Sequence, residues 1–152
     1  MATPSARAEP AWNHDPDDAR LGPTAWASID LSFEACRTGT SQSPVDIANT
    51  VEADLPPLVF DYGATPLVVE NTGHTVEVPM PESIGQTRTV GEDECRLDQY
   101  HFHAPSEHTL DGESFDAEAH LVHEKDDGEL AVIGVFFEVG VPTQRAPRRD
   151  PH

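Results

Sequence analysis

Closely spaced histidines in strand-like sequence constrain this chain more than any other feature. Five of its eight histidines lie in residues 97–123, which read LDQYHFHAPSEHTLDGESFDAEAHLVH. Side chains two apart in a strand share a face. The first alternating stretch therefore predicts a face that carries Leu97, Gln99, His101 and His103. The second predicts a face that carries Glu118, His120 and Val122.

The residues between these two stretches predict a turn. Residues 104–115 include Pro105 and the dipeptide Asp111-Gly112, which is a turn signal. An antiparallel pair of strands is the simplest arrangement of the two stretches. Such a pair would place His120 opposite His101 and His103.

Three neutral imidazoles that converge on one point make a good zinc site, and three protein ligands leave a fourth position open, as in catalytic sites. Ligating histidines also need partners that fix their tautomer. Gln99 and Glu118 each lie two residues before a candidate ligand. A single His-x-His would be read more simply as part of a solvated sheet face. The third histidine and the two partners favour a metal site at His101, His103 and His120.

Four separated parts of the chain resemble the alpha-class carbonic anhydrases, in the order of that family. They are SQSPVDI (41–47), NTGHTVEV (71–78), YHFHAPSEHTLDG with AEAHLVH (100–123), and DGELAVIGVFFEVG (127–140). The resemblance covers residues 12–140 and the first half or somewhat more of the family's domain. It implies a predominantly β fold with few short helices, built on a twisted, mostly antiparallel central sheet whose C-terminal portion is missing here.

The resemblance also implies an activity. Members of the family are zinc-dependent lyases that hydrate carbon dioxide reversibly to bicarbonate and a proton. In this chain one Zn²⁺ would be held by His101, His103 and His120. Gln99 and Glu118 would orient the ligands.

Four further residues receive roles from the resemblance. His74 matches the proton-shuttle histidine, a task that suits an imidazole because it exchanges protons near neutral pH; the alternative is an ordinary exposed histidine at a strand end. Glu107 matches the glutamate that orients the nucleophile through a threonine, and that threonine's segment has no counterpart here. Val122 and Val132 match the apolar wall of the substrate pocket, although the sequence alone would make both of them core residues.

Two other interpretations remain open at this point. One is a zinc-binding relative of the carbonic anhydrases without catalysis, which the missing threonine favours. The other is a cupin, because His101-x-His103 followed by Glu107 has cupin-like spacing with glutamate as a ligand. A cupin also needs a later Pro-x-Gly-x2-His pattern, which this chain lacks.

The two ends of the chain differ from residues 12–140. Residues 1–11 are predicted to be a disordered N-terminus. Residues 141–152, VPTQRAPRRDPH, contain three of the nine basic residues and show no apolar periodicity. They do not resemble the family, and their composition predicts disorder. The expectation is a partial domain over 12–140, truncated after about residue 140.

Charge and hydropathy restrict the partners. The formal net charge of −19 argues against nucleic acid and anionic membranes, because both are negatively charged. The longest apolar run, residues 130–137, is too short to span a bilayer. The N-terminus lacks the apolar core of a secretory signal. That makes a cytoplasmic location the default, whereas bacterial members of the resembled family are usually exported.

The sequence leaves the pairing of its two cysteines open. Cys36 and Cys95 could form a disulfide in an oxidising compartment. In bacterial relatives, the resemblance implies that the cysteine at the position of Cys36 pairs with one late in the domain. That late region has no counterpart here.

From residue 57 onward the chain reads as short β-strands separated by turn residues. The continuous apolar run at 130–137 predicts a strand buried on both faces near the middle of the sheet. In the resembled family, later strands cover part of this sheet. We therefore expect the 152-residue chain alone to be poorly soluble or molten, with little activity.

Overall fold

The computed structural model describes residues 10–81, 87–90 and 93–140. The chain divides into two compact units, Met1–Val45 and Asp46–His152. The disorder predicted for residues 1–11 and 141–152 lies outside the described residues, apart from residues 10 and 11. Within the described ranges, no helix has the length and apolar character needed to cross a membrane.

The first unit consists of short helical segments held by aromatic side chains. Trp26 donates its indole N–H to the carbonyl oxygens of Asn13, at 3.0 Å, and Leu21, at 3.1 Å. The rings of Trp12 and His14 pack edge-on against Trp26 and against each other. The helical segments are η1 (Pro23–Ala25), α1 (Trp26–Ile29), η2 (Leu31–Phe33) and α2 (Ala35–Thr38). The aromatic residues therefore anchor this irregular segment.

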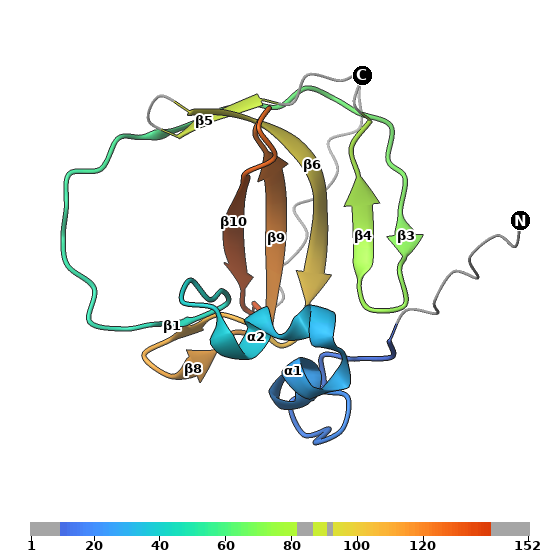
Figure 1. Cartoon of the computed structure of the whole chain (residues 1–152). Helices are drawn as coiled ribbons and strands as arrows, with labels where there is room; N and C mark the ends of the chain where they lie inside the picture. Colours follow the sequence, from blue (N-terminus) through green and yellow to red (C-terminus); the bar gives the residue numbers. More distant parts are fainter. Residues whose placement is uncertain (1–9, 82–86, 91–92, 141–152) are drawn as a thin grey trace, which may run out of the picture. The chain divides into compact units, whose positions relative to one another are not determined.

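The second unit is built on an antiparallel sheet, which confirms the predicted predominantly β fold. In the part of the chain that the structure describes, seven strands join this sheet. They are β2 (Leu58–Asp61), β3 (Glu70–Asn71), β4 (Val76–Pro79), β5 (Thr87–Val90), β6 (Asp93–His103), β9 (Ala117–Glu124) and β10 (Leu130–Phe137). The strand order is β10-β9-β6-β4-β3, and β5 pairs with both β2 and β6 (Figure 1). The long strand β6 pairs first with β5 and then with β4 on one side, and with β9 on the other.

A small second sheet joins two strands from the segment between β6 and β9 to one strand from earlier in the chain. It consists of β1 (Asp46–Ile47), β7 (Thr109–Leu110) and β8 (Glu113–Ser114). The turn from β7 to β8 uses Asp111 and Gly112, whose φ angles are 51° and 83°. Positive φ at both central residues is the geometry of a tight hairpin turn, so the predicted turn is confirmed.

A β-bulge corrects one part of the predicted face pattern. The pairing of β6 with β9 shifts register between Leu97 and Gln99. One extra residue reverses the alternation of side chains between the two faces. Leu97 therefore does not share the face of Gln99 and His101; it is buried in the core cluster with Val78 and Met80.

The strand over residues 130–137 also differs from the prediction. It forms, but β10 is the edge of the sheet among the described residues, and it alternates between half-buried and exposed positions. Leu130 and Val132 are 66% and 51% exposed. The sequence of this run has no polar residues that would mark an exposed face, so it does not distinguish a central strand from an edge strand.

The two cysteines are free thiols in this structure. Cys36 is exposed in the first unit, and Cys95 is buried in β6 of the second. The pairing that the sequence left open stays a prediction.

Candidate metal centre

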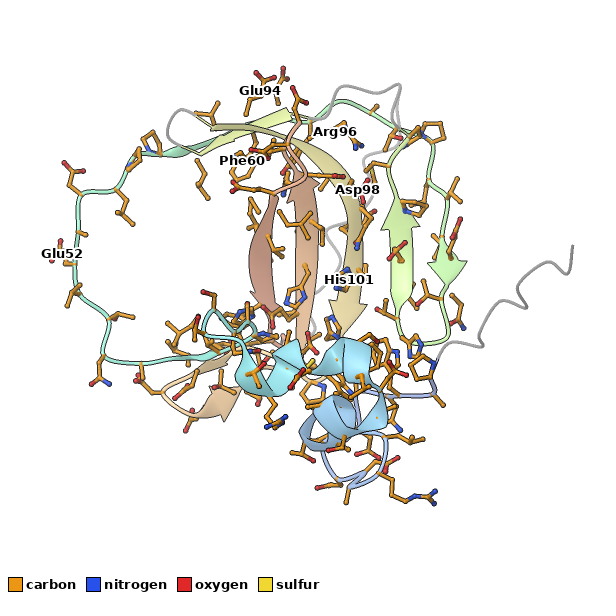
Figure 2. The ribbon with its side chains drawn as sticks, in the orientation of Figure 1. Glu52, Phe60, Glu94, Arg96, Asp98 and His101 are labelled. Atoms are coloured by element: carbon orange, nitrogen blue, oxygen red, sulfur yellow. The ribbon has the colours of Figure 1, made fainter. Side chains whose placement is uncertain are left out.

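Three histidines converge where β6 lies beside β9. Each of His101, His103 and His120 offers one ring nitrogen, and these atoms all lie within 4.8 Å of one another. In the register of the two strands, His101 is directly opposite His120, as the sequence predicts. Figure 2 places His101 in the second half of β6, away from the charged residues Glu94, Arg96 and Asp98 of the first half. The site therefore forms within one pair of hydrogen-bonded strands.

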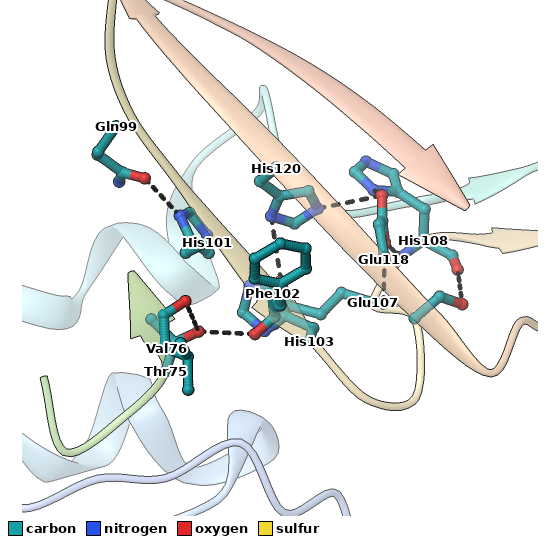
Figure 3. Close-up of polar contacts among 11 residues, drawn as sticks. Thr75, Val76, Gln99, His101, Phe102, His103, Glu107, His108, Glu118 and His120 are labelled. Carbon is teal, nitrogen blue, oxygen red and sulfur yellow. Dashed lines mark hydrogen bonds and ion pairs between the residues drawn. The ribbon is translucent and has the colours of Figure 1, made fainter. Parts of the chain in front are cut away.

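The partner of His101 determines which of its nitrogens is available. Nδ1 of His101 lies 2.8 Å from Oε1 of Gln99, its neighbour two residues earlier in β6 (Figure 3). An amide oxygen accepts, so this contact favours a proton on Nδ1. Nε2 then remains as the atom that can bind a metal. This contact suits the orienting role that the sequence predicts for Gln99.

Glu118 contacts the ring of His120 as Gln99 contacts that of His101. Its Oε1 lies 3.0 Å from Nε2 of His120, a close contact although it is not aligned as a hydrogen bond. A carboxylate at this distance favours a proton on Nε2 and leaves Nδ1 to bind a metal. Orienting partners of this kind are typical of ligating histidines.

Glu118 is held in place by the chain that follows β6. It is fully buried, and its Oε2 accepts backbone N–H bonds from Glu107, at 3.0 Å, and His108, at 2.9 Å. Its Oε1 is 2.7 Å from Nδ1 of His108. Burial raises the pKa of Glu118, but the hydrogen bonds from His108 and the charges of His120 and His108 lower it more. The net pKa lies below the usual value, so the carboxylate is ionised at neutral pH.

Glu107 lies next to the same nitrogens. Its Oε2 is 3.3 Å from Nε2 of His103 and 3.8 Å from Nδ1 of His120. The side chain of Glu107 is 22% exposed, whereas those of the two histidines are 7% and 8% exposed. The glutamate therefore borders the site from its more open side.

These donors fit Zn²⁺. Imidazole nitrogens are common zinc ligands, and three of them with oriented rings are the usual protein contribution to a catalytic zinc site. The rings of His101, His103 and His120 are mutually close, with centroids 4.9–5.2 Å apart. The residues that the sequence predicts as ligands are thus brought together.

His74 lies in the exposed turn between β3 and β4. The turn is held by Thr72, whose Oγ1 accepts from the backbone N–H groups of His74, at 3.3 Å, and Thr75, at 3.1 Å. Oγ1 of Thr75 donates to the carbonyl oxygen of Phe102, at 2.6 Å. Because Phe102 stands between two of the histidines, this bond ties the His74 turn to the ligand strand.

The two valines predicted as pocket residues are neighbours across β9 and β10. Val122 is directly opposite Val132, and Val122 lies two residues beyond His120 on the same face. Val122 is half-buried, and Val132 is exposed. The two side chains therefore form an apolar surface next to the histidines.

Two residues of the site were not assigned from the sequence. His108 contacts Glu118 through both its ring and its backbone. Gly134 in β10 is opposite His120, and a Cβ at this position would lie 2.5 Å from Oε1 of Glu118. Glycine inside a strand marks close approach of another group, so Gly134 could have been recognised. Nothing in the sequence around His108 distinguishes it from a surface histidine.

A sequence model of a protein family described as "Eukaryotic-type carbonic anhydrase" matches residues 21–148. Among curated relatives, a carbonic anhydrase of Neisseria gonorrhoeae is 39% identical over 129 residues, covering 85% of this chain and 50% of the relative. One from Klebsiella pneumoniae is 34% identical, covering 85% and 51%. The chain thus spans about half the length of the curated relatives it matches.

Solved structures show the same relationship in three dimensions. The alpha-carbonic anhydrase of Thermovibrio ammonificans, in complex with the inhibitor sulfanilamide, superposes with a TM-score of 0.77 at 38% identity, covering 86% of this chain and 57% of that one. Dioscorin complexed with ascorbate gives a TM-score of 0.75 at 36% identity, covering 82% and 53%. The mostly antiparallel sheet described above is therefore the fold of these proteins.

Proposed function

Because the chain belongs to the eukaryotic-type carbonic anhydrase family, we propose that it takes part in the reversible hydration of carbon dioxide to bicarbonate and a proton. One Zn²⁺ would be bound by His101, His103 and His120. The observation that carries the proposal is the convergence of three imidazole nitrogens within 4.8 Å. A cupin is disfavoured, because the family match accounts for the same histidines.

Zinc bound by three imidazoles lowers the pKa of a bound water molecule to about 7, which supplies a nucleophile at neutral pH. The chain's own residues prepare the site. Gln99 and Glu118 contact the rings of His101 and His120, and these contacts would turn one nitrogen of each ring toward the metal. Without these partners the rings could turn, and metal affinity typically falls 10–100-fold.

Other residues would handle the substrate and the proton. The paired valines Val122 and Val132 offer an apolar surface beside the histidines, which suits an uncharged molecule such as carbon dioxide. His74 is exposed to solvent and would pass the released proton to buffer. Glu107 would help to orient the attacking oxygen, a role that in the resembled family passes through a threonine with no counterpart in residues 1–152.

The test measures metal content and hydration on the same chain. We expect about one zinc per chain after extensive washing, and His103→Ala should lose most of it, because two imidazoles make a poor site. His152→Ala removes a histidine outside the family match and is the matched control. Equal zinc in His103→Ala and the control would reject the site.

A second candidate function is zinc binding without catalysis. It is favoured by the contacts of Glu107, whose carboxylate lies beside the nitrogens of His103 and His120. Stopped-flow hydration of carbon dioxide separates the two functions. One zinc per chain with no hydration above the rate of His103→Ala would select the second.

A further inference from the structure

We propose that Ser106 is a positioning residue of the metal centre. Its hydroxyl group holds the segment that follows β6 in the shape that fixes Glu118 against the ring of His120. The inference rests on the three-histidine site of the proposed function. It concerns a residue that binds neither metal nor substrate and that acts through Glu118.

The hydroxyl group of Ser106 joins two points of this segment. Its Oγ donates to the carbonyl oxygen of His108, at 2.7 Å, and accepts the backbone N–H of Phe115, at 2.9 Å. The backbone N–H of Ser106 donates in turn to the carbonyl oxygen of Phe115, at 3.0 Å. Ser106 is buried, so loss of the hydroxyl group leaves its partners in a poorly hydrated place. Ser106 and Phe115 therefore close residues 107–114, which include the hairpin of β7 and β8, at their base.

The closed segment presents two backbone N–H groups to one carboxylate oxygen. Those of Glu107 and His108 donate to Oε2 of Glu118, at 3.0 and 2.9 Å. The ring of His108 contacts Oε1 of the same carboxylate, and Figure 3 shows Glu118 between His108 and His120. Because Oγ of Ser106 fixes the carbonyl oxygen of His108, it also restrains the N–H group and the ring with which His108 contacts Glu118.

The other end of the bridge is held by aromatic packing. The ring of Phe115 stacks on that of Phe136 in β10, with centroids 4.2 Å apart and an interplanar angle of 12°. Phe136 is directly opposite Glu118 in the pairing of β9 with β10. The N–H group that Ser106 accepts is thus fixed relative to the strand that carries Glu118. The hydroxyl group connects this fixed point to His108.

The competing explanation is that Ser106 only stabilises the fold. Removal of its hydroxyl group would then lower the free energy of unfolding, because the N–H of Phe115 and the carbonyl of His108 lose a partner. Any loss of zinc binding would come from unfolding alone and would be the same whether or not Glu118 is present. If Ser106 acts through Glu118, the loss of zinc binding disappears when Glu118 is removed.

Chelator competition on the unchanged chain and on Ser106→Ala measures the effect on zinc. An orienting partner contributes about 10–100-fold to metal affinity, and a residue one step further away contributes less, so we expect a loss of about 3–10-fold. Ser114→Ala is the control, because it removes a hydroxyl group from an exposed position of β8 in the same segment. In a Glu118→Ala background, Ser106→Ala should cause no further loss. Equal affinity in Ser106→Ala and Ser114→Ala, or an equal loss with and without Glu118, would overturn the inference.

The second readout is the position of the proton on the ring of His120 in the metal-free chain, followed by nitrogen NMR of the histidine side chains. Oε1 of Glu118 lies 3.0 Å from Nε2 of His120, which favours the proton on Nε2. We expect Ser106→Ala to populate the other tautomer as well, whereas Ser114→Ala keeps the tautomer of the unchanged chain. Weaker zinc binding with an unchanged tautomer would make Ser106 a residue of general stability and refute the positioning role. Failure of the three-histidine site is recognised separately, because His103→Ala would then bind zinc as well as the unchanged chain.

Discussion

Gly134→Ala tests whether the sheet makes room for the carboxylate that orients His120. A Cβ at residue 134 would lie 2.5 Å from Oε1 of Glu118 and 3.7 Å from its Cδ. Contacts below 3.0 Å do not persist, so Glu118 must move by roughly 1 Å to reach ordinary van der Waals separation. The carboxylate cannot move freely, because Glu107 and His108 hold it with backbone N–H groups.

The magnitude follows from the bonds that such a shift breaks. Oε1 of Glu118 is 2.7 Å from Nδ1 of His108 and 3.0 Å from Nε2 of His120. Hydrogen bonds to a charged group contribute about 1.5–3 kcal/mol each. Replacing glycine by alanine in a strand returns about 0.5–1 kcal/mol. Only the contact with His108 is aligned as a hydrogen bond, so we expect Gly134→Ala to lower the free energy of unfolding by about 0.5–2.5 kcal/mol. We expect it to lower zinc affinity by about 10–100-fold.

Urea unfolding and chelator competition measure the two effects. Gly140→Ala is the control, because a Cβ there has nothing within 4 Å. In a Glu118→Ala background the added methyl has no carboxylate to displace, so Gly134→Ala should cost nothing further. If Gly134→Ala unfolds and binds zinc as Gly140→Ala does, the steric argument is wrong.

Three other predictions concern separate parts of the chain. Tyr62→Phe should lower the free energy of unfolding by about 1–3 kcal/mol in urea, because His123 is fully buried and its Nε2 lies 2.6 Å from the Tyr62 hydroxyl; an unchanged midpoint would contradict this. The side chain of Thr109 and the backbone N–H of Gly112 lower the pKa of Asp46 below 3.8. The bonds of the Asp46 carboxylate therefore stabilise the folded chain above pH 3.8. This stabilisation is lost only as the pH falls through the lower pKa that Asp46 has in the folded chain. The NMR chemical shift of the Gly112 amide should report the titration of Asp46 with a midpoint below pH 3.8. A midpoint at or above that value would refute the hydrogen bond between Gly112 and Asp46. His74→Ala should slow hydration when buffer is dilute, and imidazole should restore the rate; a loss that imidazole does not restore would indicate a structural role.

The pairing of β6 with β9 shows what the sequence determines here. The alternation of residues through His101, His103 and His120, with the Asp111-Gly112 turn signal between them, predicts two antiparallel strands with the histidines opposite each other. Local sequence suffices because neighbouring strands of one sheet place side chains by a simple period of two. The contacts of Gln99 with His101 and of Glu118 with His120 follow from the same period.

Other features depend on contacts between residues far apart in the chain. The bulge after Leu97 moves the Leu97 side chain to the core face. No residue in this part of the sequence predicts the bulge. The edge position of β10 depends on which strands pair, not on the apolar character of residues 130–137. The bonds of Glu118 with Glu107 and His108, and the space left by Gly134, arise only when β9, β10 and the segment after β6 meet. The period of a strand thus selects the face of each histidine, whereas tertiary contacts decide what surrounds the three histidines.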